Sequence, residues 1–242
     1  LFSTLVSIAV AVSMVAGCAQ PAVEVDSDDI GGRVSSESGP EAGVWVVAET
    51  TDLPTRFIRI VATDDEGLYL LPDLPEASYE IFVRGYGLVD SPRVTAAPGD
   101  HLDLVGVVAP DSAAAAEVYP AAWWLSMLEL PDGERSQQEL VSAVTGCMNC
   151  HQVGNRATRE IPEIVMSNAE SHLAAWDQRV AMGPMAGGMS SMYSRLGEQR
   201  QMFADWTERI AAGEVPTQSP PRPTGLERNV VVTLWDWGTE TD

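Results

Sequence analysis

The pentapeptide Cys147-Met148-Asn149-Cys150-His151 constrains the chemistry of this chain more than any other stretch. Two thiols three residues apart can each add to a vinyl group of one porphyrin, which gives two thioethers from a single turn of chain. The imidazole that follows is then held where it can ligate the iron. This spacing predicts a covalently attached c-type haem, with Cys147 and Cys150 as the thioether residues and His151 as the proximal iron ligand.

Other uses of a C-x-x-C pair need a setting that this sequence does not provide. A thioredoxin-type disulfide would follow a strand in a βαβ unit, and no such pattern is visible. A structural zinc site needs four ligands, but there is no second cysteine pair, and His101 and His172 are distant and isolated. The pentapeptide thus resembles the haem-binding segment of c-type cytochromes, which implies haem iron and electron transfer.

Composition narrows the class of protein further. The 242 residues are 45% hydrophobic with a mean hydropathy of −0.02, which is typical of one large or two small globular domains. A net charge of −21 with only 14 basic residues argues against nucleic acid as a partner. The acidic surface suits an encounter with a basic redox partner protein, although solubility alone explains it equally well.

Residues 1–18 have the pattern of a signal peptide and lipoprotein leader. An almost wholly apolar run ends at Val15-Ala16-Gly17-Cys18, which resembles the lipobox of bacterial lipoproteins with Cys18 as the lipidated residue. An uncleaved membrane anchor is the alternative. Because the sequence begins with Leu1, we expect the natural protein to start earlier. Either interpretation places the rest of the chain in the periplasm or at the cell surface, followed by a tether over residues 19–29.

Residues 30–110 alternate short apolar runs with turn residues, which predicts a small β-sandwich. The expected strands are Ile30–Ser35, Gly43–Glu49, Phe57–Ala62, Gly67–Leu71, Tyr79–Arg84 and Leu102–Val108. This segment resembles the carboxypeptidase regulatory-like domain, which has a transthyretin-like fold. The resemblance lies in Gly32-Arg33-Val34, Gly43-Val44-Trp45-Val46, the acidic turn Thr63–Tyr69, Leu74-Pro75 and Tyr79-Glu80-Ile81. It implies a packing module more than a carbohydrate-binding one, since no row of exposed aromatic residues is visible.

Residues 111–214 change to helical spacing, which predicts an all-α cytochrome c-like domain. The expected fold class is therefore multidomain β + α, a transthyretin-like β-sandwich followed by this domain. The capping-box pattern Ser136–Glu139 predicts a helix that runs into Cys147, and Ser167–Glu170 predicts a second helix. A closing helix is expected over Tyr193–Gly213, where apolar residues recur on one face.

The segment Met182–Met192 contains four of the nine methionines and is interrupted by glycine and proline. We expect it to form a loop that brings a soft, neutral sulfur to the distal face of the iron. Met189 is the preferred distal ligand and Met185 the next, because cytochrome relatives keep a methionine at the position of Met189. Core filling is the alternative role for these side chains. His172 is a rival ligand, but its place near the start of a helix predicts exposure.

The C-terminal part is predicted to leave the helical domain. Residues 215–228 are rich in proline and read as a linker. Residues 229–242 begin with an apolar strand, Asn229–Trp237, for which we find no partner within the chain. This strand resembles the start of a β-propeller of the virginiamycin B lyase-like group, which implies that the chain is the front of a longer protein.

Three functions are compatible with these features. The first is extracytoplasmic electron transfer through one haem c, to a redox partner protein or a downstream catalytic domain. The second is the electron-accepting front end of a larger lyase- or dehydrogenase-like propeller enzyme. The third is a carbohydrate- or surface-binding module in which the C-x-x-C-H stretch is incidental. We find no independent catalytic residues, because no nucleophile–base set, carboxylate pair or phosphate loop is present.

Overall fold

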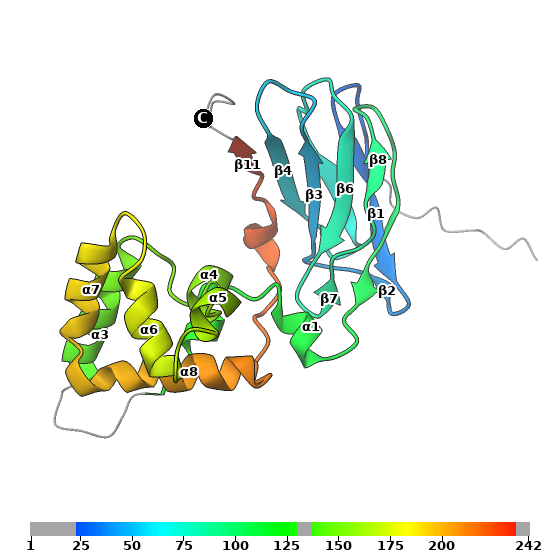
Figure 1. Cartoon of the computed structure of the whole chain (residues 1–242). Helices are drawn as coiled ribbons and strands as arrows, with labels where there is room; N and C mark the ends of the chain where they lie inside the picture. The colour runs from blue at the N-terminus through cyan, green and yellow to red at the C-terminus, as the bar shows by residue number, and fades with distance from the viewer. Residues whose placement is uncertain (1–22, 130–136, 236–242) are drawn as a thin grey trace, which may run out of the picture.

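The computed structural model describes residues 23–129 and 137–235, and Figure 1 shows a β part with a helical part beside it. The leader and Cys18 lie outside the described residues. The strands are β1 (Ile30–Ser36), β2 (Gly39–Pro40), β3 (Trp45–Thr50), β4 (Phe57–Ala62), β5 (Leu68–Leu71), β6 (Tyr79–Arg84), β7 (Leu88–Val89), β8 (Val94–Ala96), β9 (Leu104–Val105), β10 (Val107–Val108) and β11 (Val232–Trp235).

Two main sheets enclose the core of the β part. One has the order β11-β4-β3-β6-β8, and the other has the order β2-β1-β5 with β9 added in parallel to β1. Alternate residues of each strand point inward, so Val46 of β3 pairs with Val61 and Val83 on the neighbouring strands, and all three side chains are buried. The largest side chains of this core include Phe57 and Tyr79, which contact edge to face at 6.2 Å between ring centroids.

The predicted acidic turn before β5 is confirmed. The Asp64 carboxylate accepts hydrogen bonds from the backbone N–H groups of Glu66 and Leu68, at 2.9 and 2.8 Å. Gly67 has φ +75°, and a Cβ there would lie 2.5 Å from the carbonyl oxygen of Val34. The position thus requires glycine both for its backbone angle and for the close approach of β1.

The helices are short, since proline and glycine recur between them. They are α1 (Ser112–Ala116), α2 (Ala121–Leu125), α3 (Gln137–Met148), α4 (Arg156–Arg159), α5 (Glu163–Met166), α6 (His172–Val180), α7 (Ala186–Ser194) and α8 (Gln201–Ala211), with 3-10 turns η1 (Gly197–Arg200) and η2 (Gly225–Arg228). They pack around Trp206 of α8, which is fully buried and donates its indole N–H to the Trp124 carbonyl at 2.9 Å. Within the described ranges, no helix is long and apolar enough to cross a membrane.

The predicted fold class is wrong. The second half of the chain is largely helical but does not form a clear all-α cytochrome domain, and its last strand, β11, joins the large sheet of the β part. Thr233 of β11 pairs with Arg59 of β4, and Trp235 pairs with Phe57. The expectation that this strand lacks a partner within the chain is therefore also wrong. By pairing, β4 and β11 satisfy backbone N–H and C=O groups that each strand would leave without hydrogen bonds if it were a free sheet edge. The apolar pattern of the sequence does not reveal which strands pair.

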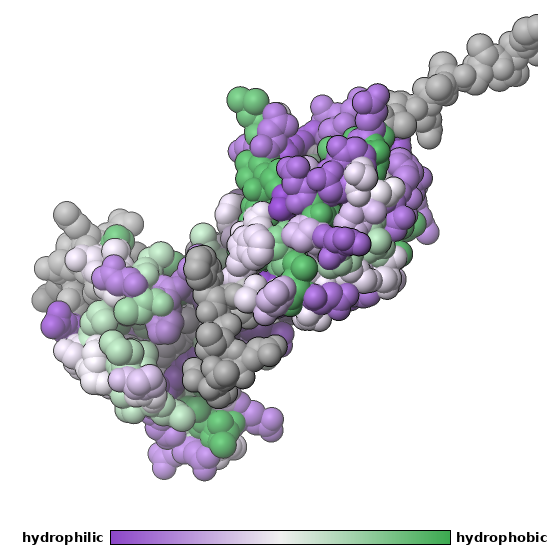
Figure 2. All heavy atoms as spheres, turned by 90° about the horizontal axis from the view of Figure 1, so that it is seen from above, coloured by the Kyte–Doolittle hydropathy of each residue, from purple (hydrophilic) through white to green (hydrophobic). Residues whose placement is uncertain are grey.

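Two helix boundaries also differ from the prediction. Ser167 ends α5, and the residue that caps α6 is Ser171, whose hydroxyl accepts a hydrogen bond from the Ala174 N–H at 3.1 Å. The expected closing helix over Tyr193–Gly213 is divided, because Gly197 at φ +58° separates α7 from the η1–α8 segment. Apolar side chains remain exposed on β11, among them Leu234 and Trp235. Figure 2 shows that the surface of the β part is mostly hydrophilic, with some green, apolar areas.

Residues 215–228, predicted as a linker, lie against the β part. The Arg222 guanidinium bonds the Glu41 carboxylate at 2.5 Å and donates to the carbonyl oxygens of Tyr86 and Ala42 at 2.9 and 3.2 Å. The Glu41 side chain is only 8% exposed, so Arg222 supplies the partner that a buried carboxylate needs. Gly43 allows the approach, because a Cβ there would lie 2.5 Å from the Pro223 carbonyl oxygen. Arg222 thus ties the end of the helical part to the β part.

We predict that Arg222→Ala lowers the free energy of unfolding by about 2 kcal/mol, since it leaves a buried carboxylate without its partner. Urea denaturation followed by circular dichroism measures this change. Arg56→Ala is the matched control, because the Arg56–Glu49 pair at 2.9 Å is more exposed and should contribute less than about 1 kcal/mol. Equal losses for the two variants would contradict the prediction.

Candidate functional site

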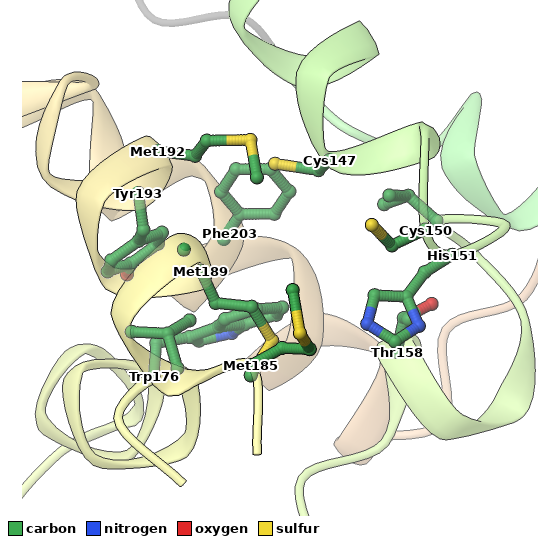
Figure 3. Close-up of a pocket in the computed structure, with 13 residues that line it drawn as sticks. Cys147, Cys150, His151, Thr158, Trp176, Met185, Met189, Met192, Tyr193 and Phe203 are labelled. Carbon is green, nitrogen blue, oxygen red and sulfur yellow. The ribbon is translucent and has the colours of Figure 1, made fainter. Parts of the chain in front are cut away.

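A cavity in the helical part brings the predicted haem residues together. It lies between the end of α3 and the facing helix α7, and Figure 3 shows its side chains. The empty space within it, counting the part that is open to solvent, is about 730 Å³. Its lining is apolar apart from the cysteines, histidine, threonine and tyrosine, and comprises Cys147, Cys150, His151, Val153, Thr158, Trp176, Val180, Met185, Gly188, Met189, Met192, Tyr193 and Phe203.

The pentapeptide forms one wall of this cavity. α3 ends at Met148, and the backbone N–H groups of Cys150 and His151 both donate to the Cys147 carbonyl oxygen, at 3.4 and 3.3 Å. This single turn places both thiols and the imidazole on the same wall (Figure 3). Cys147 is half-buried, whereas Cys150 and His151 are exposed. The predicted helix running into Cys147 is therefore confirmed.

Methionines form the opposite wall, but they do so on a helix. The expectation of a loop over Met182–Met192 holds for residues 182–185 and is wrong for the rest, since α7 begins at Ala186 and Met185 is its N-cap. Met185, Met189 and Met192 are spaced by four and three residues, which places them on one face of the helical turn. Figure 3 shows the Met185 and Met189 side chains on the side of the cavity that faces His151. Met182 does not line the cavity and is 53% exposed.

α3 and α7 approach each other closely at a glycine. A Cβ on Gly146 would lie 3.4 Å from the Met192 sulfur, so the absence of a side chain at this position brings Met192 next to the Cys147 turn. Sequence reasoning missed this contact. The sequence does offer one signal, because Gly146 directly precedes Cys147 and a side chain at this position would narrow the cavity.

Aromatic side chains form the inner surface of the cavity. Trp176 of α6 stacks on Tyr193 with 5.9 Å between ring centroids and 18° between planes, and contacts Phe203 of α8 at 5.2 Å. The helical spacing predicts that Trp176 and Phe203 face inward, and both are buried. That they line a cavity was not predicted, because spacing identifies the buried face of a helix but not a gap beneath it.

The geometry of the thiols and imidazole bears on the alternative of a single metal ion. Among the described residues, the one group of at least three His, Cys, Asp or Glu side chains with ligand atoms within 4.8 Å of one another is Asp26, Asp28 and Asp29. Ligands of one zinc ion at about 2.3 Å lie no more than about 4.6 Å apart. The ligand atoms of Cys147, Cys150 and His151 do not all lie within 4.8 Å of one another.

The rival ligand His172 and two other polar residues, Arg159 and His101, lie elsewhere. His172 faces away from this cavity, and its Nδ1 lies 3.4 Å from the Thr207 hydroxyl. Arg159 is buried with its guanidinium 4.0 Å from the centroid of the Trp124 ring, and it lines a second cavity together with His172. His101 belongs to the β part, where it forms a bridge with Gly31. None of these three side chains reaches the C-x-x-C-H wall.

Burial controls the protonation of the groups in the cavity. It raises the pKa of the Cys147 thiol, and the neighbouring Cys150 adds to this shift, while a backbone hydrogen bond opposes it. Burial also raises the pKa of the Tyr193 phenol, and Asp177 adds to that shift. Both groups therefore remain neutral at neutral pH, in keeping with the apolar character of the cavity.

No protein-family model and no curated protein matches this sequence. Function must therefore be inferred from the residues of the cavity.

We predict that, in haem-free protein, iodoacetamide modifies Cys147 more slowly than Cys150 at pH 8. The raised pKa leaves less thiolate at Cys147, and its half-burial slows access. The pH at which Cys147 labelling reaches half of its maximal rate should lie above that of an ordinary thiol. Peptide mass mapping after timed labelling measures both rates, and a Cys147 that reacts first would contradict the burial argument.

Proposed function

We propose that this chain binds one haem c covalently through Cys147 and Cys150 and transfers electrons outside the cytoplasm. One observation supports this most directly. The two thiols and the imidazole of the C-x-x-C-H turn share an apolar cavity with methionine thioethers on the facing helix. Thiols for attachment, an imidazole and a soft sulfur donor are the protein groups that a low-spin haem c requires.

The residues present fit such a group. The cavity is lined mostly by apolar side chains, and Trp176, Tyr193 and Phe203 supply flat walls for a planar group. Haem iron, when bound, accepts and returns one electron by changing between its ferric and ferrous states. Apolar walls would limit the contact of a bound haem with water, which would favour the less charged ferrous state and so raise the reduction potential.

Each polar group of the cavity has a distinct task in this proposal. Cys147 and Cys150 hold the haem in place, and His151 is the proximal ligand. Met189 is the preferred distal ligand, with Met185 next, because both face the His151 wall (Figure 3). A neutral thioether stabilises ferrous iron over ferric iron. With a donor on each face, the site favours electron transfer over chemistry that needs an open coordination position.

The proposal includes the location and the partners that the sequence predicts. A lipid anchor at Cys18 would hold the chain at a bacterial membrane, in the periplasm or at the cell surface, where haem c attachment takes place. The net charge of −21 suits a redox partner protein with a basic docking surface.

We predict that Cys147→Ser combined with Cys150→Ser abolishes covalent haem, because no thioether can form. The variants are produced with a cytochrome c maturation system, and a denaturing gel is stained for haem. Cys18→Ser is the matched control, since it removes a cysteine outside the pentapeptide and should leave the stain intact. Stain in the double variant, or none in the wild-type chain, would contradict the proposal.

We also predict that Met189→Ala retains covalent haem but lowers its reduction potential, because the thioether donor is lost. Spectroelectrochemical titration measures the potential, and Met185→Ala tests the second candidate in the same way. Met182→Ala is the control, since Met182 lies outside the cavity and is exposed. If neither Met189→Ala nor Met185→Ala changes the potential, the distal methionine ligand is excluded.

A further inference from the structure

Thr207 of α8 lies between two cavities of the helical part. Its side chain is only 2% exposed, and it lines the second cavity, on the far side of α6 and α8 from the C-x-x-C-H wall. Trp176, which lines the candidate haem cavity, lies next to it. Thr207 therefore contacts a wall residue of the candidate haem cavity and also lines the second cavity.

The Thr207 hydroxyl is hydrogen-bonded to both neighbours on α6. The Trp176 indole N–H donates to its oxygen at 3.1 Å, and the His172 Nδ1 lies 3.4 Å from the same oxygen. The hydroxyl proton is directed to the Phe203 or Ala204 carbonyl oxygen, at 3.0 and 3.2 Å. A hydroxyl offers one donor and two acceptor sites, and the Trp176 N–H takes one of the acceptor sites.

The positions of His172, Trp176 and Thr207 explain why the Thr207 hydroxyl affects the orientation of the indole. His172 and Trp176 are four residues apart and thus lie on one face of α6, which packs on α8 where Thr207 is located. A buried indole N–H is costly to leave without an acceptor. In the described part of the chain, the Trp176 N–H donates to the Thr207 hydroxyl. The bond therefore fixes the rotation of the indole plane that stacks on Tyr193.

We propose that Thr207 is a positioning residue of the candidate haem site, which acts by holding the Trp176 indole as a rigid wall of the cavity. This proposal rests on the proposed function, because the wall is assigned to the haem cavity. Thr207 does not itself line that cavity, so its effect reaches the site only through Trp176. A fixed indole keeps water out, and solvent access is one of the factors that set the potential of a haem.

Thr207→Val tests the proposal, because it removes the hydroxyl and keeps the shape of the side chain. In the matured full chain, NMR follows the exchange of the Trp176 indole N–H with solvent, and redox titration gives the potential. We expect exchange to become about tenfold faster, the effect of losing one hydrogen bond, and the potential to fall.

Three further variants separate positioning from general stability. Thr207→Ser keeps the hydroxyl and should restore both wild-type values. Thr145→Val is the matched control, since the Thr145 hydroxyl makes a comparable bond to a helix carbonyl, that of Val141, at 2.7 Å. In a Trp176→Phe background, where the indole N–H is absent, Thr207→Val should produce no additional change in potential.

The possible results distinguish the two claims. Unchanged indole exchange or unchanged potential in Thr207→Val would overturn the positioning role, as would a potential shift that persists in the Trp176→Phe background. A Thr207→Ser variant as altered as Thr207→Val would also overturn it. Protein that carries no covalent haem would overturn the proposed function instead, and the exchange measurement would then still decide whether Thr207 fixes Trp176.

Discussion

Burial of aromatic side chains beneath the C-x-x-C-H turn is the interaction on which the helical part depends. Short helices such as α4 and α5 do not persist alone in water, so packing must stabilise them. Trp206 is fully buried at the centre, and Trp176 and Phe203 extend the same cluster to the cavity. Each such ring contributes about 2 kcal/mol or more by leaving water. The core that stabilises the helices therefore also forms the wall of the site.

The junction between the helical and β parts depends on a different kind of interaction. Arg222 pairs with the buried Glu41 carboxylate, and Tyr86 of the β part contacts Tyr119 of the helical part edge to face at 5.9 Å. Such a charge pair contributes little net stability but is costly to break, so it favours one arrangement of the two parts over others. Pairing of β11 with β4 adds a second connection close by. The candidate site is thus carried on a part whose place relative to the β-sheets is defined.

Local features of the sequence predicted local features of the structure. The positions of β1, β3, β4, β5 and β6, the tight turn at Asp64–Gly67 and the helix leading into Cys147 each follow from spacing within a few residues, and the structure has them. The short strands β2, β7 and β8 were not predicted, and the expected strand Leu102–Val108 is divided into β9 and β10. The pairing of β11 and the docking of Arg222 join residues more than a hundred positions apart, and no local pattern encodes them. They account for the error in the predicted fold class.

In the candidate site, too, local features could be predicted from the sequence, whereas contacts between distant segments could not. The pentapeptide and the methionine-rich segment could be predicted as partners, because their chemistry is evident from residue type. The glycines of Met182–Met192 misled the structural prediction, since Gly187 and Gly188 lie within α7, where packing overrides their low helix propensity. The role of Thr207 could not be predicted, because its contacts with His172 and Trp176 exist only once α6 and α8 pack together.

The intact mass of the chain, produced with a cytochrome c maturation system and measured under denaturing conditions, tests the central claim most directly. Our account predicts a mass increased by that of one haem, carried on the peptide that contains Cys147 and Cys150. An unmodified mass, with both cysteines still open to alkylation, would contradict the account and leave the C-x-x-C-H turn without its proposed role.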